Sequence, residues 1–219
     1  MPTLDYAPRL VEANRTYRIT ADRDLTTQSR YWAPGTYVLD QGAEGACVGY
    51  GVTGEWLASP VRGKAHIWEA TKLAQDVYRA AQKIDEWEGE AYDGTSVRAG
   101  MLAGRDRGWW SGFSWAFTMP ELRTALETGP VVIGVNWHAS MYVAPNAKVN
   151  VFGSVVGGHC LLLTGYSPNW RKAGPHYRLR NSWGRTWGAN GSAYIAADDL
   201  YRILFAAGGE AAVPTGRTA

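Results

Sequence analysis

Four residues of the sequence have the types that nucleophilic catalysis by a cysteine requires. Cys47 lies in the glycine-rich stretch LDQGAEGACVGYG, and Gln41 precedes it by six positions. His159 begins an apolar run in VVGGHCLLLTGY, and Asn181 lies in LRNSWG. A cysteine nucleophile needs a base to form the thiolate, a group that orients the base, and donors for the oxyanion. The four residues supply a candidate for each of these needs.

Each residue type suits one role. We expect Cys47 to open a helix, whose positive end favours a thiolate. His159 would be the base, and the side-chain oxygen of Asn181 would fix its ring and tautomer. Gln41 and the backbone N–H of Cys47 would donate to the oxyanion. On residue type alone, a structural thiol, a core histidine and two loop amides remain the alternative.

Helices are predicted in the first part of the chain. Apolar spacing and capping residues indicate helices from Cys47 to about Ala58, over 66–87, from about Ser96 to Gly108, and from Thr118 to Gly129. Three glycines weaken the first of them, namely Gly49, Gly51 and Gly54. They would make sense if another segment packs close to that helix.

Strands are predicted after Gly129. The short runs PVVIGVNW, HCLLLTGYS, HYRLRNSW and GSAYIAADDL are rich in β-forming residues and separated by Gly, Pro and Asn. Helices followed by strands predict an α+β protein with a helical lobe over about 40–128 and a sheet lobe over about 129–206. Residues 1–30 read as an extended arm or short strands, and 207–219 as a flexible, frayed tail.

Composition excludes several kinds of function. The 219 residues carry a net charge of +2 without a basic run, so nothing favours nucleic acid binding. No apolar stretch is long enough to span a membrane and no signal peptide is visible, which predicts a cytoplasmic protein. Two cysteines and four histidines lack metal-ligand spacing. We expect two free thiols, no metal and no cofactor.

The segments around the four residues resemble the papain family of cysteine peptidases. VLDQGAEGACVGYG is similar to the family segment that contains the glutamine and the nucleophile, and GGHCLLLTGY to the histidine segment. NSWGRTWGANGSAYI is similar to the asparagine segment and is the most specific of the three. The likeness runs from about Tyr37 to Ile195. It implies a two-lobed fold, with a helical lobe, an antiparallel sheet or barrel lobe, and an active-site cleft between them.

The resemblance also implies roles for particular residues over the peptidase domain, 31–206. Catalysis of peptide-bond cleavage is assigned to Cys47, His159, Asn181 and Gln41. Trp183 would shield the hydrogen bond between the histidine and the asparagine. Substrate binding is assigned to the backbone of Gly94 and to a roomy pocket near the histidine, formed by Gly134, Gly157, Gly158 and Cys160.

Departures from the family pattern bear on control and location. Glu44 stands where the family has a disulfide cysteine, which favours a reducing compartment. Only 46 residues precede Cys47, too few for the usual inhibitory pro-region. Three possibilities are open: the chain is active as soon as it is made, a regulatory or inhibitory partner controls it, or residues 1–28 inhibit it. The last predicts that deleting these residues raises activity.

Two other functions remain open at this stage. The same chemistry on peptidoglycan cross-links would make the chain a lysis enzyme or a virion-associated hydrolase. A papain-like fold can also be a non-catalytic binding module. The expected source is prokaryotic or phage, with a location in the virion or the host cytoplasm if a phage encodes it.

Overall fold

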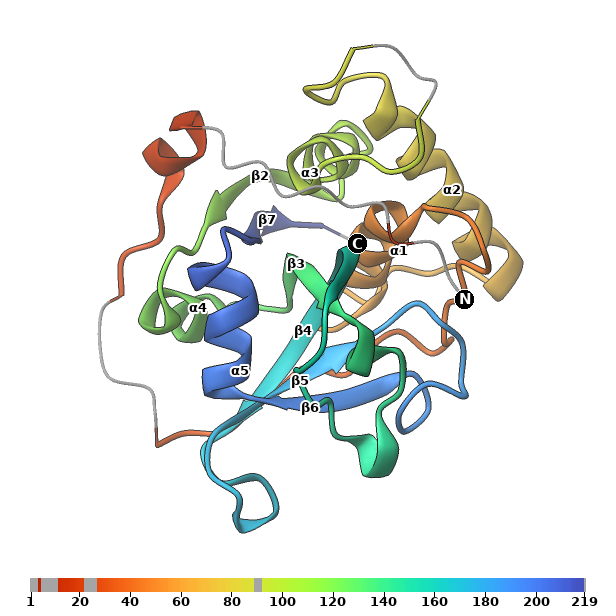
Figure 1. Ribbon diagram of the computed structural model, residues 1–219. Helices are drawn as coiled ribbons and strands as arrows, with labels where there is room; N and C mark the ends of the chain where they lie inside the picture. The colour runs from red at the N-terminus through yellow and green to blue at the C-terminus, as the bar shows by residue number, and fades with distance from the viewer. Residues whose placement is uncertain (1–3, 5–11, 22–26, 89–91, 219) are drawn as a thin grey trace.

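The computed structural model describes residues 4, 12–21, 27–88 and 92–218 (Figure 1). The α-helices are α1 (Cys47–Leu57), α2 (Ile67–Gln82), α3 (Val97–Asp106), α4 (Met119–Ala125) and α5 (Ala197–Tyr201). The strands are β1 (Arg30–Tyr31), β2 (Trp110–Trp115), β3 (Val131–His138), β4 (Val155–Ser167), β5 (His176–Arg180), β6 (Ser192–Ala196) and β7 (Glu210–Arg217). Short 3-10 and π segments are η1 (Glu12–Tyr17), η2 (Ala139–Tyr142), η3 (Pro145–Ala147), η4 (Trp170–Lys172) and η5 (Arg202–Ala206).

The strands form one antiparallel sheet with helices on both faces. Its order is β2-β7-β3-β4-β5-β6, and β1 adds to β4. Figure 1 shows α1, α2 and α3 on one side, and α4 and α5 on the other. Alternation along β3 sends Val132 toward the cluster shared with α1 and α3, and Ile133 toward the cluster shared with α4 and α5. The predicted α+β architecture is confirmed.

Two of the glycines in α1 allow close packing, as their presence predicts. A Cβ atom at Gly49 would overlap the backbone oxygen of Ala74 in α2. A Cβ atom at Gly51 would lie 3.0 Å from the sulfur of Cys160 in β4. Gly54 has nothing within 4 Å of such an atom, so packing does not explain it. The helix that begins at Cys47 is therefore pressed between α2 and the sheet.

The C-terminal segment is ordered, and the prediction of a flexible tail over 207–219 is wrong. Glu210–Arg217 forms β7, which pairs with β2 and with β3. Pro214 lies opposite Phe113 of β2, beyond the three residues that β7 pairs with β3. A proline is tolerated there because its missing N–H interrupts no bond to a second neighbour.

The predicted lobe boundary also needs correction. The helical lobe was expected over about 40–128, but β2 within it pairs with β7. Leu122 and Ala125 of α4 belong to the core cluster of the sheet rather than to that of α1 and α3. The helical layer is therefore formed by α1, α2 and α3.

The predicted N-terminal arm lies partly outside the described residues. Its described part contains η1, a β-bridge between Arg18 and Trp115, and the first residue of the short strand β1. Ile19 donates a backbone hydrogen bond to Trp115 of β2. Arg18 forms an ion pair of 2.5 Å with Glu121 of α4. These contacts attach residues 12–21 to the molecule beside β2.

Candidate active site

Cys47 is the first residue of α1, and its side chain is fully buried. The first backbone N–H groups of a helix have no partner within the helix and, with the helix dipole, favour a negative charge beside them. A thiolate is stabilised in such a place relative to the thiol. The predicted position of Cys47 at a helix N-terminus is confirmed.

The packing of α1 carries Cys47 to the strand of His159. Gly51 lies four residues after Cys47, about 6 Å along the helix axis. It contacts Cys160, which directly follows His159 on β4. Cys47 and Cys160 also share one buried cluster. The candidate nucleophile and the candidate base therefore come from two elements that are packed against each other.

His159 is buried and its ring packs against two tryptophans, which also pack against each other. The centroids of Trp137 and Trp183 each lie 4.7 Å from that of the imidazole. His159 Nε2 lies 2.7 Å from Asn181 Oδ1. The backbone N–H of Ser182 donates to the same oxygen at 2.8 Å, which identifies that atom as an acceptor. Nε2 must therefore carry the proton, and Nδ1 holds the basic lone pair.

The environment of His159 favours the neutral ring. Burial lowers its pKa from 6.5 to about 4, and the smaller effect of the Asn181 hydrogen bond is in the opposite direction. His159 Nδ1 has no hydrogen-bond partner in the part of the chain that the structure describes, Cys47 included. Catalytic hydrogen bonds are often long before substrate binds. A charged His159 needs a nearby anion, and the Cys47 thiolate is the candidate.

Gln41 joins the loop before Cys47 to the loop that contains Asn181. Its backbone N–H donates to Ser182 O at 2.9 Å, and its Oε1 accepts from Ser182 Oγ at 2.8 Å. Its Nε2 donates to Glu44 O at 2.9 Å. An amide nitrogen has a second hydrogen. Gln41 is thus fixed at both ends of its amide, and its Nε2 has a second N–H.

Ser182 and Trp137 contribute to the site without having been predicted. Ser182 stands in the motif NSWG beside Asn181, so its position was a usable signal. Trp137 lies on β3, and only the pairing of β3 with β4 brings it to His159. Nothing in its local sequence distinguishes it from the other ten tryptophans.

Trp183 packs against the ring of His159, whose hydrogen bond with Asn181 the resemblance expects it to shield. It is 8% exposed and lies against the His159 ring. Tyr142 of η2 stacks on it with centroids 5.5 Å apart and an angle of 17°. A groove lined by Tyr142, Val143 and Trp187 borders its outer side. The tryptophan therefore separates the buried imidazole from an open aromatic groove.

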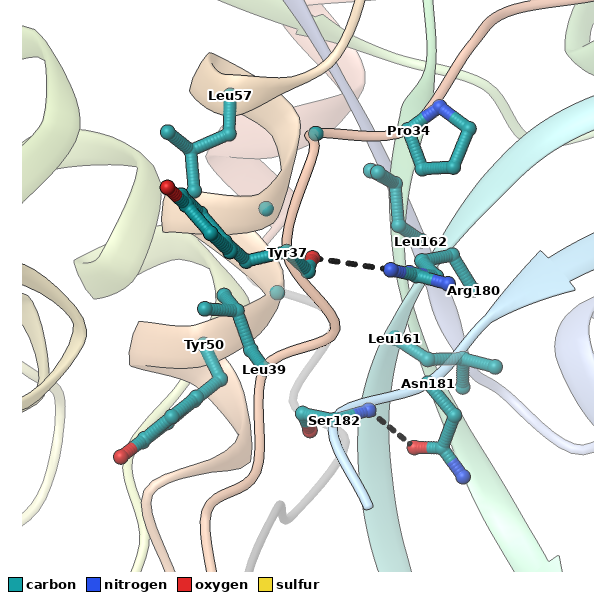
Figure 2. A pocket seen from close by; sticks show the side chains of 13 residues that line it. Pro34, Tyr37, Leu39, Tyr50, Leu57, Leu161, Leu162, Arg180, Asn181 and Ser182 are labelled. Atoms are coloured by element: carbon teal, nitrogen blue, oxygen red, sulfur yellow. Dashed lines mark hydrogen bonds between the residues drawn. The ribbon is translucent and has the colours of Figure 1, made fainter. Parts of the chain in front are cut away.

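An apolar crevice lies on the other side of the Asn181 loop (Figure 2). Figure 2 shows Tyr50 and Leu57 of α1 on one side and Leu161 of β4 on the other, with the segment 34–39 running between them. Arg180 Nη2 donates to Tyr37 O at 3.0 Å across it. The crevice is part of the seam between α1 and the sheet, and it ends at Asn181 and Ser182.

The residues predicted to form one pocket divide between the two faces of the sheet. Gly134 lies opposite Cys160, on the face toward α1. Gly157 lies opposite Trp137, on the face that carries His159, and a Cβ atom there would lie 2.7 Å from Leu4 Cβ. Gly158 is buried and pairs with Asn136 on the first face. Leu4 of the N-terminal arm thus lies beside Gly157, which is two residues before His159 in the chain.

Gly94 does not have the free N–H group that its predicted role requires. Its backbone N–H donates to Tyr78 Oη at 3.0 Å, and the residue is buried. Its φ of +93° is a conformation that glycine adopts without strain. In this structure the Gly94 N–H holds its turn against Tyr78 of α2 and is not available to a substrate.

The described residues contain no group of three or more His, Cys, Asp or Glu side chains that could hold a metal ion. Over the same residues, no helix combines the length and the apolar character that crossing a membrane requires.

Comparisons with known proteins agree with this arrangement. Residues 112–203 match the sequence profile described as papain family cysteine protease, a range that contains His159 and Asn181 but neither Cys47 nor Gln41. A search of curated proteins finds no match.

Solved structures with a similar fold include three cysteine proteases or their precursors. Xylellain, a cysteine protease from Xylella fastidiosa, has 17% identity and a TM-score of 0.69, over 97% of this chain and 96% of that one. Procathepsin L 3 of the Tenebrio molitor larval midgut has 16% identity and a TM-score of 0.63, over 90% and 73%. Bromelain from Ananas comosus, in complex with the E64 inhibitor, has 14% identity and a TM-score of 0.55, over 84% and 94%.

The fold, the family match and the arrangement around His159 lead to one conclusion. The chain has the fold of papain-like cysteine proteases, and its residues 112–203 match the papain family, which identifies it as a cysteine peptidase that acts on a protein or peptide substrate.

Proposed function

We propose that the chain is an endopeptidase in which Cys47 is the nucleophile, His159 the base, Asn181 its orienting group and Gln41 an oxyanion donor. The observation that carries the proposal is the 2.7 Å contact between His159 Nε2 and Asn181 Oδ1. This contact leaves the lone pair on Nδ1. It therefore supports a role for His159 as the base that takes the proton of the thiol at the start of α1.

The reaction begins with transfer of the Cys47 proton to His159 Nδ1. The thiolate attacks the peptide carbonyl carbon, a C–S bond forms, and the electron pair of the carbonyl moves to its oxygen. Gln41 Nε2 and the backbone N–H of Cys47 donate to that oxyanion. Burial of His159 makes its charged form costly, so the thiolate and then the oxyanion are the negative charges that stabilise it.

Acylation ends when the C–N bond breaks and His159 gives its proton to the leaving amine. The ring is then neutral again, and it takes a proton from a water molecule that attacks the thioester. The C–S bond breaks, the carboxylic acid leaves, and the proton returns to Cys47. Asn181 holds the same ring orientation in both halves of the reaction, because its oxygen is itself fixed by the Ser182 N–H.

Labelling with an epoxysuccinyl peptide tests the nucleophile. We expect intact mass to show one adduct on the wild type and none on Cys47→Ala. Cys160 is a built-in control, because burial raises its pKa well above the usual value and the thiolate is the reactive form. Labelling of Cys47→Ala, or an unlabelled folded wild type, would refute the assignment.

The same preparation separates the remaining alternatives. Cleavage of casein or a fluorogenic peptide by the wild type, and its loss in Cys47→Ala and His159→Ala, is the expected result. Clearing of a cell-wall suspension without peptide cleavage would identify a peptidoglycan peptidase. Absence of both activities in a protein that takes the label would favour a substrate class outside the peptides assayed.

A further inference from the structure

Cations and acids are distributed unevenly along the chain. Residues 128–197 contain no Asp or Glu but six cations, namely Lys148, Arg171, Lys172, Arg178, Arg180 and Arg185. The other 149 residues contain 16 cations and 20 acids, which gives them a net charge of −4. The net charge of +2 for the whole chain therefore conceals a cationic segment, and this segment contributes β3, β4, β5 and β6.

The six cations of this segment form no salt bridge with any residue that the structure describes. Elsewhere in the described chain seven cations pair with acids, for example Arg202 with Asp199 at 2.6 Å. Asp40, the acid that lies beside Gly184, accepts a hydrogen bond from the Gly42 N–H instead. Positive charge that is not balanced nearby attracts an anion from solution.

Three of the cations gather around an aromatic pair at the outer strands of the sheet. Arg178 and Arg180 point to one face of β5, because side chains alternate along a strand. Arg178 lies opposite Tyr194 of β6, and Trp170 stacks on Tyr194 with centroids 4.7 Å apart. Arg171 lies 4.6 Å from the centroid of the Trp170 ring. These five residues are called the Tyr194 face. Figure 1 shows β5 and β6 away from α2 and α3.

The Tyr194 face is accessible and extends to the loop of Asn181. Arg171 is exposed, and Arg178 and Arg180 are partly exposed. Burial, and then the charges of Arg178 and Arg185, lower the pKa of Arg180 to about 10. Arg185 is therefore close enough to add to the same positive field. Because Arg180 directly precedes Asn181 and lines the crevice of Figure 2, the cationic surface ends beside the candidate active site.

The arginines of the Tyr194 face are suited to carboxylates rather than to nucleobases. Its rings already stack on each other or lie against an arginine, which leaves few ring faces on which a base could stack. A guanidinium that lies on a ring still offers its N–H edge to a carboxylate. Arg178 and Arg180 are about 7 Å apart along β5, which is also the spacing of alternate side chains in an extended peptide.

From this arrangement we propose that the Tyr194 face binds an acidic segment of a polypeptide, with acids at alternate positions of an extended chain. The proposal goes beyond the peptidase reaction, because the cations that carry it lie outside the groups that cleave the peptide bond. Several exposed ion pairs act together in such a contact, so its strength depends on the salt concentration.

Fluorescence anisotropy with the full chain carrying Cys47→Ala tests this binding without cleavage. The probe is a labelled peptide of alternating glutamate and serine, and the reference has glutamine in place of glutamate. We expect the glutamate peptide to bind about 10-fold more tightly at low salt, and the ratio to approach one at about 1 M NaCl. Adding Arg171→Gln, Lys172→Gln and Arg178→Gln should reduce the ratio to about one at low salt as well.

A matched control removes the same charge from the helical layer. Lys72→Gln, Arg79→Gln and Arg105→Gln together should keep the ratio, with circular dichroism showing that both triple variants are folded. If the first triple variant does not fold, Lys172→Gln with Arg185→Gln, two exposed positions, should by itself lower the ratio. Equal binding of the two peptides, or an equal loss in both triple variants, would overturn the proposal. Tighter binding of an oligothymidylate of the same length would overturn it in favour of nucleic acid.

Discussion

A buried ion pair joins the helix of Cys47 to the strand of Glu210, and its removal gives a strong test of the fold. Glu55 of α1 lies 2.6 Å from Arg217 Nε of β7, and the two side chains are 1% and 9% exposed. Arg217 Nη2 also donates to Pro130 O at 3.0 Å. Burial raises the pKa of Glu55, and Arg217 acts against this rise.

Arg217→Met should destabilise the protein by about 3–5 kcal/mol, because it leaves the Glu55 carboxylate buried without its cation. For a chain of this length, this corresponds to a fall in Tm of roughly 6–20 °C. Glu55→Leu combined with Arg217→Met should recover most of the loss, because the double variant buries no charge. The variant Glu55→Leu alone leaves the arginine without its partner and should also be destabilised.

The loss should depend on pH in a defined direction. The folded-state pKa of Glu55 lies above its unfolded value of about 4.5, and removal of Arg217 raises it further. Stability is therefore lost as pH rises through the folded pKa, and the effect of Arg217→Met should be smaller at pH 5 than at pH 8.

Urea denaturation of the four proteins at both pH values provides the measurement. A loss below about 1 kcal/mol for Arg217→Met at pH 8, or a double variant no more stable than the single ones, would refute the reasoning. Either result would mean that the pair behaves as an exposed salt bridge does.

Two further predictions concern His159 and the packing of α1. Because the folded pKa of His159 is about 4 and its usual value is 6.5, the unfolded state binds the proton first as pH falls. This group should make the protein about 2–3 kcal/mol less stable at pH 4.5 than at pH 7.5, and His159→Asn should lack that part of the acid loss in urea denaturation. Gly49→Ala should lower the free energy of unfolding by about 1–3 kcal/mol, because the added Cβ atom would overlap the backbone oxygen of Ala74. Gly54→Ala, in the same helix with nothing within 4 Å, should gain about 0.5–1 kcal/mol, and equal effects of the two would contradict the packing argument.

Local patterns predicted the helices well. Thr118 accepts from the Glu121 N–H, and Ser96 from the Ala99 N–H, so both predicted helix starts were readable from residue types three positions apart. The four apolar runs after Gly129 became β3, β4, β5 and β6. These features depend on interactions within one segment, which a sequence displays directly.

Long-range pairing was not predictable in the same way. The strand β7 contains Pro214 and Gly216, which locally indicate a break rather than a strand. It forms because β2 and β3, at least 70 residues earlier in the chain, offer edges that accept it. The same reason explains why the partner of the Gly94 N–H could not be predicted, since only the fold brings Tyr78 to it.

The place of β7 in the sheet has a consequence for how a newly made chain matures. It follows every other strand in sequence but lies between β2 and β3. While the ribosome still holds Glu210–Arg217, the facing edges of β2 and β3 have unpaired backbone groups. The sheet that carries His159 is thus expected to become complete only after synthesis has passed β7.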